Sequence, residues 1–402
     1  MTTTKKSNLL TILLISLCAC LIYAISSGIR SNYGVMLSAI SENSGVSYSS
    51  VSFVLAVAQL TFGIMQPVFG ILALRKSNSF VLCLGAILLA GGLLLIPACH
   101  SMASLLLFLG ILMPAGTGAL SFGIIMGAIT PLLGEKKAAT VSGLVSASSG
   151  LGSIILSPAL QSLLAGKGLW SAMLFLSVPT LCLIPISIWL SKYSQTGQTE
   201  GTEKNVSLKV LFLDAIQNRS YQFLMIAFFT CGFHMAIIET HLFTQITTYG
   251  FSEKTAAYAF SLYGITTMAG SVISGILCSK FRMKWVLGGF FGSRPFIILA
   301  FLLLPKNIVT IYLVAALLGF TGSSTVPPTS GLVGKLFGPA KLATLFGIVF
   351  VSHQVGSFFS SWLGGICVSA TGGYTLIWCV SAVFSTVAAI VSFCVKEEKH
   401  QA

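Results

Sequence analysis

Charged residues are scarce in this chain. Asp, Glu, Lys and Arg make up only 8% of its 402 residues, and aspartate occurs once, at Asp214. A single aspartate excludes a paired-aspartate site within a membrane, and the sequence has no HExxH motif, no GxSxG motif and no phosphate-binding glycine loop. We therefore expect no enzymatic activity. The short polar segments also leave no room for the nucleotide-binding domain of a primary pump.

The spacings that mark metal sites are missing as well. Ten cysteines are present, nearly all within apolar runs, but no CxxC pair occurs and no cysteine has ligand-like spacing to a histidine. We expect the cysteines to act as small apolar packing residues. The sequence therefore predicts no metal and no cofactor.

Most of what remains is apolar. Hydrophobic residues make up 55% of the chain and form about a dozen runs, without the alternation of a membrane barrel. Each run is long enough to cross a hydrocarbon core of about 30 Å as a helix. The composition predicts an all-α membrane protein with twelve transmembrane helices. The predicted spans are 9–37, 49–74, 79–97, 102–131, 138–164, 169–190, 221–249, 255–278, 285–304, 308–332, 342–368 and 374–393.

The basic residues predict how the chain is oriented. About 17 of the 22 Lys and Arg fall in the N-terminus, alternate loops and the C-terminus, whereas the other loops hold only Lys167, Lys254 and Lys306. Lys and Arg concentrate in cytoplasmic loops, so the net charge of +13 needs no nucleic acid to explain it. We predict a multi-pass protein of the cell (inner) membrane, surrounded by lipid bilayer, with both termini cytoplasmic. The first run has no small-residue cleavage site, so we expect a span rather than a targeting peptide.

A long polar segment and an internal repeat divide the chain in two. The segment contains SQTGQTEGTEKN, which cannot bury enough apolar area to fold alone. Residues 118–152 align without a gap on 322–356, with Lys137 recurring as Lys341 and Gly152 as Gly356. Six spans per repeat, an even number, give both copies the same direction through the membrane. The predicted units are an N-terminal six-helix bundle at 1–191, a cytoplasmic linker at 192–218 and a C-terminal six-helix bundle at 219–402.

Several short motifs resemble those of one transporter family. They are Gly28-Ile29-Arg30 with Tyr33-Gly34, Gln66-Pro67 with Gly70, Thr240-His241-Leu242, Arg294, and His353-Gln354 with Gly356. With the repeat, they make the whole chain similar to the major facilitator superfamily, and within it to bacterial relatives of the monocarboxylate porters. The resemblance implies two six-helix halves that move a small molecule by alternating access. It also implies that Tyr33 and Gln354 take part in substrate binding or gating.

The chain departs from the family pattern in two places. The basic turns at 70–76 and 275–280 lack the acidic residue that such turns usually carry. The arginine that animal monocarboxylate porters and oxalate antiporters have in their eighth span is missing. In this chain Gly270 and Ser271, in the predicted span 255–278, lie near its place.

A few ionisable side chains lie within the predicted spans. They are Arg30, His234, Glu239, His241, Arg294 and His353. A charge at mid-bilayer costs about 2.5 to 3.5 kcal/mol, so each is a candidate functional residue. Arg30 lies roughly 33 Å along its span, and Glu239 and His241 lie nearly as far along the equivalent span of the second repeat. We therefore expect these residues to face each other across the central axis.

Arg30 has three candidate roles. Its guanidinium matches a carboxylate, which favours attraction of an anionic substrate. The alternatives are an external gate formed by pairing with Glu239, and extension to the outer lipid headgroups. We favour the substrate or gate roles.

The segment CGFHMAIIETHLF predicts two distinct helix faces. At 100° per residue, His234 and His241 lie within about 20° of each other, whereas Glu239 lies roughly 160° from His241. The family resemblance favours the histidine face as the cavity lining, with Glu239 beside a neighbouring helix or at the gate. Glu239, His241 and His353 are candidates for proton coupling, because histidine titrates near neutral pH. Neutral, hydrogen-bonded imidazoles are the alternative.

Other polar residues are candidates for the cavity wall. His353 lies about 17 Å into its span, near the midplane where transporter sites usually lie. Gln59 and Gln66 share one helix stripe, which suits either ligand binding or helix packing. Arg294 precedes Pro295, and it is predicted either to contact the substrate or to pair with backbone carbonyls freed by the proline.

Together these features predict a monomeric secondary transporter. The favoured substrate is a small organic anion held by Arg30, His241 and His353 and co-transported with protons (symport). The alternative is an efflux pump for drug-like or metabolite molecules driven by proton antiport, suggested by the aromatic and Met-rich spans.

Overall fold

A computed structural model describes residues 9–133, 135–194, 213 and 215–397, and every regular element in them is helical. The first half contains α1 (Leu9–Ser31), α2 (Tyr33–Ser44), α3 (Tyr48–Arg75), α4 (Asn78–Leu95), α5 (Met102–Leu105), α6 (Met113–Ala119), α7 (Phe122–Leu133), α8 (Glu135–Leu181) and α9 (Leu183–Ser194). The second half contains α11 (Arg219–Ile237), α12 (Phe243–Thr248), α13 (Glu253–Lys280), α14 (Met283–Leu303), α15 (Ile308–Gly322), α16 (Val326–Phe337), α17 (Pro339–Thr371) and α18 (Thr375–Cys394). Short 3₁₀ or π turns join some of these: η1 (Ile96–Ala98), η2 (Leu106–Leu112), η3 (Ile238–Leu242) and η4 (Ser323–Thr325).

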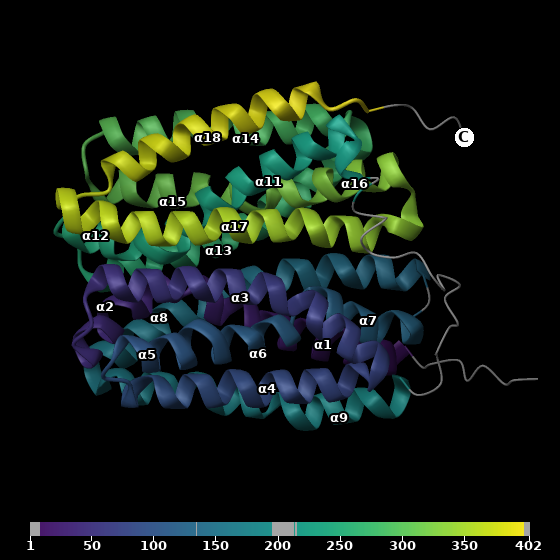
Figure 1. The fold of residues 1–402 in the computed structure, drawn as a ribbon, viewed down its shortest axis with the longest axis horizontal. Helices are drawn as coiled ribbons and strands as arrows, with labels where there is room; N and C mark the ends of the chain where they lie inside the picture. Colours follow the sequence, from purple (N-terminus) through teal and green to yellow (C-terminus); the bar gives the residue numbers. More distant parts are fainter. Residues whose placement is uncertain (1–8, 134, 195–212, 214, 398–402) are drawn as a thin grey trace, which may run out of the picture.

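The helices form two bundles that lie side by side. Helices α1 to α9 occupy the lower part of Figure 1, and α11 to α18 occupy the upper part. We call the end that holds Arg75, Lys280 and Cys394 the linker end, and the opposite end, with Tyr48 and Tyr374, the far end. Most of the predicted linker, 192–218, lies outside the described residues.

The twelve predicted spans all correspond to helices. Ten described segments are long and apolar enough to cross a membrane. One of them, Leu144–Leu190, covers most of the fifth predicted span and all of the sixth, which are separated at Gly168, a residue with φ of 76° that suits glycine. The 33-residue α17 covers the eleventh predicted span. The predicted all-α membrane fold is therefore confirmed.

Close glycine contacts hold equivalent helix pairs together in both halves. Gly28 of α1 lies directly against Gly152 of α8, and Gly232 and Gly356 give α11 and α17 the same intimate packing. A side-chain carbon at any of these glycines would overlap backbone atoms of the partner helix. Small residues are what allow membrane helices to approach this closely. Gly152 and Gly356, which the sequence repeat aligns, therefore allow the same close helix contact in each half.

Most of the contact between the two halves comes from two helix pairs, α3 with α17 and α8 with α13. At the far end, Gly365 packs on Ser52, and the Phe53 ring lies 5.5 Å from Trp362. Near mid-helix, Gly150 of α8 contacts Met268 of α13. The halves are thus closed against each other from the far end to about the middle of the helices.

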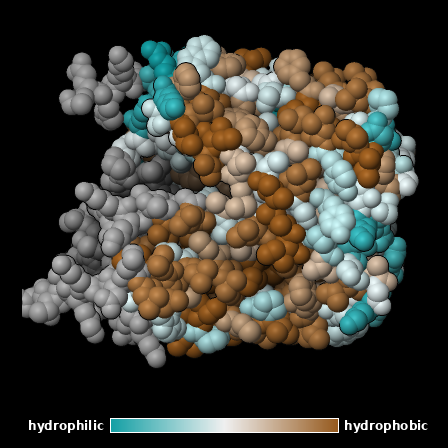
Figure 2. Space-filling model, turned by 180° about the vertical axis from the view of Figure 1, so that it is seen from behind, coloured by the Kyte–Doolittle hydropathy of each residue, from teal (hydrophilic) through white to brown (hydrophobic). Residues whose placement is uncertain are grey.

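Toward the linker end these contacts stop. Gly70 continues the face of α3 that holds Gln59 and Gly63, and Gly347 continues the face of α17 that holds Gln354. In the described part of the chain, nothing lies within 4 Å of where a side-chain carbon at Gly70 or Gly347 would be. Figure 2 shows the surface hollowed between the lobes on this side, next to the grey residues. The halves therefore diverge toward the linker end.

Glu397, just beyond α18, connects the end of α18 to the start of α14 and to α16 at the linker end. Its carboxylate accepts hydrogen bonds from the backbone N–H groups of Met283 (3.3 Å) and Lys284 (3.2 Å), at the start of α14, and from Lys335 Nζ at 2.6 Å. Only 4% of the Glu397 side chain is exposed. A carboxylate at a helix N-terminus satisfies free N–H groups and stabilises the helix dipole.

These contacts change how Glu397 titrates. Burial raises the pKa of the Glu397 carboxyl, but the hydrogen bonds from Lys335, Lys284 and Met283 outweigh burial and leave its pKa below the usual value. A lowered folded-state pKa gives stability that is present above the unfolded pKa, about 4.3 for glutamate, and is lost as the pH falls through the folded-state value.

We predict that Glu397→Gln lowers the stability of the purified protein by about 1 to 2 kcal/mol at pH 7, because the hydrogen bonds lose their charged acceptor. Thermal unfolding followed by circular dichroism measures the shift, with the exposed Glu42→Gln as control. The wild type and Glu397→Gln should converge as the pH falls below about 4. A stability difference between the wild type and Glu397→Gln that is as large below pH 4 as at pH 7 would contradict this role.

Candidate functional site

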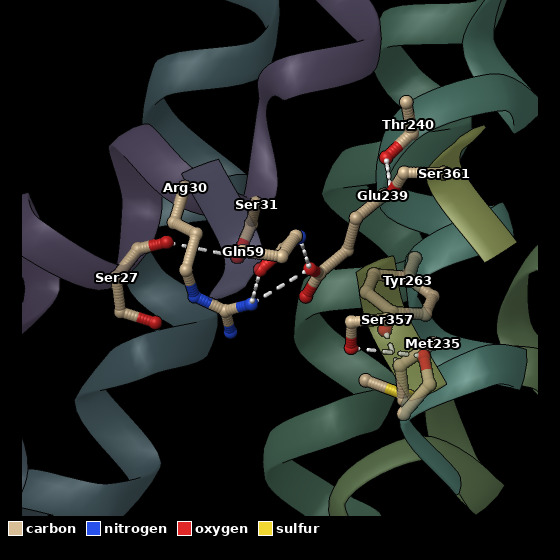
Figure 3. A network of polar contacts seen from close by, with 11 residues as sticks. Ser27, Arg30, Ser31, Gln59, Met235, Glu239, Thr240, Tyr263, Ser357 and Ser361 are labelled. Carbon is tan, nitrogen blue, oxygen red and sulfur yellow. Dashed lines mark hydrogen bonds and ion pairs between the residues drawn. The ribbon is translucent and has the colours of Figure 1, made fainter. Parts of the chain in front are cut away.

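An ion pair joins the two halves at the centre of the molecule. Arg30 of α1 points across to Glu239 of η3, and Gln59 of α3 lies between them (Figure 3). Arg30 Nη1 donates to Glu239 Oε2 at 2.9 Å and to Gln59 Oε1 at 3.3 Å, and Gln59 Nε2 donates to Glu239 at 3.5 Å. The expected juxtaposition of Arg30 and Glu239 is therefore present.

The pair is buried but not sealed. The Glu239 side chain is 4% exposed and that of Arg30 16% exposed, and the guanidinium carbon lies 5.2 Å from the centre of the Phe62 ring. Among the described residues, all hydrogen bonds of the guanidinium come from Nη1. Nε and Nη2 therefore remain as donors for another group.

Both helices that carry the pair are interrupted beside it. The α1 helix ends one residue after Arg30, and Asn32, whose amide donates to the Gly28 carbonyl at 2.7 Å, leads into α2. In the second half, Glu239 and His241 lie within the π-helical turn η3. Such turns insert an extra residue into a helix and are frequent at functional sites. Equivalent helices of the two repeats are thus irregular at the same place.

His241 lies on the opposite side of η3 from the ion pair, at the far-end contact. Its Nε2 lies 2.9 Å from the Ser361 carbonyl, so Nε2 carries a proton, and its Nδ1 lies 3.0 Å from the Tyr48 hydroxyl. Tyr48 also lies 3.0 Å from the Tyr374 hydroxyl. Tyr48 belongs to the first half and the other three residues to the second, so the hydrogen bonds of His241 help to close the far end.

His234 turns into its own bundle. Its Nδ1 lies 2.9 Å from Ser381 Oγ, and its ring packs edge-on against Trp378, 6.2 Å away. The side chain is completely buried between α11 and α18. The family resemblance favoured the histidine face of this helix as the lining. In the structure His234 packs within its own half, His241 contacts Tyr48, and Glu239 also faces the other half. The extra residue of the π-helical turn changes the rotation of the helix there, which a regular 100° step does not capture.

Three further candidates are buried near the contact between the halves and lack hydrogen-bond partners. Within the described residues, the Tyr33 hydroxyl, His353 Nδ1 and both atoms of the Gln354 amide make no hydrogen bond. Gln354 lies against Gly63 of α3. Burying an unpaired amide costs at least about 1 kcal/mol. Such groups are suited to form hydrogen bonds with a ligand that binds there.

Arg294 pairs with backbone rather than with a carboxylate. Its Nη2 donates to the carbonyls of Thr321 (2.8 Å) and Gly322 (2.9 Å), at the end of α15, and the guanidinium contacts Cys231 Sγ and the face of Phe291. The side chain is fully buried. The carbonyls come from the break between α15 and η4, not from the turn before Pro295. A cation at a helix C-terminus stabilises the helix dipole.

The structure brings Arg30, Gln59 and Glu239 together, and within its described part Tyr33 Oη, His353 Nδ1 and the Gln354 amide have no hydrogen-bond partner. His234, His241 and Arg294 have partners inside or at the edge of the second half. Sequence reasoning missed Tyr48, Tyr374, Phe62 and Phe350, because single aromatic residues in apolar spans carry no distinguishing pattern. Among the described residues, no group of three metal-binding side chains lies close enough to hold an ion.

A family model and curated relatives agree with this architecture. The model described as Major Facilitator Superfamily matches residues 19–293 and 246–402, and the chain belongs to this superfamily of membrane transporters. The chain is 24% identical to the uncharacterized MFS-type transporter YcxA of Bacillus subtilis (strain 168), over 85% of each protein. It is 23% identical to monocarboxylate transporter 13 of Rattus norvegicus, over 82% of this chain and 76% of the relative. The resemblance to the monocarboxylate-porter-like branch is confirmed.

Solved structures share the fold. A crystal structure of a D-xylose-proton symporter matches with a TM-score of 0.73 and 14% identity, over 96% of this chain and 98% of that one. A bacterial homolog of the human lysosomal transporter Spinster, in an inward-facing and occupied conformation, matches with a TM-score of 0.75 and 14% identity over 96% of each chain. Membership of the superfamily makes the chain a secondary transporter and not an enzyme, as the sequence predicts.

We predict strong energetic coupling between Arg30 and Glu239. Arg30→Met or Glu239→Met alone leaves an uncompensated buried charge and should cost about 3 to 5 kcal/mol, whereas the double variant should cost less than either. Thermal stability of the four proteins in detergent provides the double-mutant cycle. Additive losses would show that the two charges do not interact.

We also predict that Arg294→Met destabilises the second half, because the Thr321 and Gly322 carbonyls lose their donor at about 1 to 3 kcal/mol each. Arg294→Lys should recover part of the loss, since an ammonium still donates. The thermal midpoint measures both, with the exposed Arg282→Met as control. A midpoint that Arg294→Met leaves unchanged would contradict the proposed support.

Proposed function

We propose that the transporter carries a small organic anion together with protons, with Arg30 as the anion site. The observation that carries this proposal is the Arg30–Glu239 ion pair between the halves, in which two guanidinium nitrogens make no hydrogen bond to any described residue. A guanidinium presents paired N–H groups that match a carboxylate. In this proposal Glu239 holds the place of the substrate carboxylate while the site is empty.

Proton coupling follows from competition for Arg30. An ionised Glu239 occupies the guanidinium, and a protonated Glu239 no longer attracts it, so proton uptake frees Arg30 for the substrate. One proton and one carboxylate then travel together without net charge. This matters for import, because moving a single anion into a cell against 100 mV costs about 2.3 kcal/mol.

The divergence of the halves suits alternating access. We propose that 1–191 and 219–402 rock as two units joined by 192–218, in a monomer. Arg75, Lys280 and Lys335 lie toward the linker end, so the positive-inside rule makes this end cytoplasmic in a cell (inner) membrane. The structure then corresponds to a state open to the cytoplasm, with the Tyr48–His241–Tyr374 cluster closing the outside.

The test is uptake of labelled carboxylates into proteoliposomes with an imposed pH gradient. We predict that an inwardly directed proton gradient raises wild-type accumulation at least about 10-fold and that Arg30→Ala abolishes it, since the site loses about 1.5 to 3 kcal/mol or more of charge-assisted hydrogen bonding. Glu239→Gln should still exchange carboxylate across the membrane but no longer accumulate it with the gradient.

Arg75→Ala, at the exposed end of α3, is the matched control and should transport normally. Carboxylate uptake that survives Arg30→Ala would overturn the anion site. Outward movement of other compounds coupled to inward proton flow would instead identify the antiport alternative.

A further inference from the structure

A chain of aromatic rings begins directly beside the Arg30 guanidinium. Phe62 of α3 lies under Arg30, and its ring is 6.2 Å from that of Phe350 of α17. Phe350 stacks on the His353 imidazole with centroids 5.2 Å apart and planes 4° apart. Phe228 of α11 completes the group, 5.3 Å from His353 and 6.4 Å from Phe350. We call Phe62, Phe228, Phe350 and His353 the ring cluster.

The ring cluster lies where the halves begin to part. Phe62 and Phe350 touch where α3 and α17 meet. Gly347 lies about one turn from Phe350 toward the linker end; it is exposed, and no atom of a described neighbouring helix lies within 4 Å of where its side-chain carbon would be. Phe350 itself is only partly buried. A ligand that reaches Arg30 from the linker end therefore passes over or between these rings.

Unpartnered polar atoms border the same rings. His353 belongs to the cluster and its Nδ1 makes no hydrogen bond, and the adjacent Gln354 amide is fully buried with neither atom paired within the described residues. Plain packing of two membrane helices does not need a buried amide without partners, because such a group costs free energy. An arriving ligand with polar atoms of its own would satisfy it.

We infer that the anion carried at this site has a flat aromatic body. This inference rests on the proposed function and deepens it. The carboxylate pairs with the Arg30 guanidinium that a protonated Glu239 releases, the ring enters the Phe62–Phe350 contact, and polar substituents of the ring meet His353 Nδ1 and the Gln354 amide. Short aliphatic monocarboxylates fill only the guanidinium end of this arrangement.

Two probes of similar size and charge separate a flat ring from a merely apolar one. Benzoate and cyclohexanecarboxylate are compared by competition against labelled benzoate on the full-length protein in proteoliposomes, with acetate as the short carboxylate. Aromatic pairing contributes about 0.5 to 1.5 kcal/mol, so we expect benzoate to bind about 3- to 10-fold more tightly than cyclohexanecarboxylate. Phe350→Leu should reduce this ratio to less than about 2-fold while the protein still binds carboxylates.

Phe62→Leu should have the same effect from the other half, which keeps the test valid if one variant does not fold. Phe358→Leu is the control, because Phe358 lies further along α17 in a separate aromatic group with Phe53 and Trp362. A ratio near one in the wild type, or a ratio that both cluster variants leave unchanged, overturns the inference but not the proposed function. Absence of Arg30-dependent binding for all three carboxylates would remove the proposed function itself.

Discussion

The buried ion pair between Arg30 and Glu239 is the constraint on which the rest of the arrangement depends. Neither charge is tolerable alone at this depth, and each half of the molecule supplies one of them. Closing the halves at the far end therefore satisfies both charges, and any movement that parts them must offer a replacement. Substrate, proton or water is the available replacement, so the pair links the conformation of the bundle to what occupies its centre.

The two repeats share the same helix packing but differ in how the helices that carry the two charges are interrupted. Gly152 and Gly356 bring equivalent helices into the same close contact, whereas the helices that carry the ion pair are interrupted differently, at Asn32 in one half and by a π-helical turn in the other. In both halves the close glycine packing precedes the irregular segment next to the charges. The duplication supplies the scaffold, and its divergence supplies the asymmetry that a small, polarised ligand needs.

Much of the fold and one part of the site could be predicted from the sequence. Run lengths gave the spans, and the repeat together with equal depths placed Arg30 opposite Glu239. The partners of His234, His241 and Arg294 could not be predicted, because they depend on how each helix rotates about its axis. The π-helical turn alters that rotation at Glu239 and His241. Glu397 was missed for another reason, since its contacts join the end of α18 to the start of α14, more than a hundred residues earlier.

Arg294 has a consequence for the tenth span. Its guanidinium holds the carbonyls of Thr321 and Gly322, where α15 gives way to η4 and α16. An arginine does not lose its proton in a protein, so this clasp persists at every pH at which the fold survives. The interruption between α15 and α16 is therefore held by a permanent cation, and the tenth span keeps this irregularity without depending on the protonation of any group.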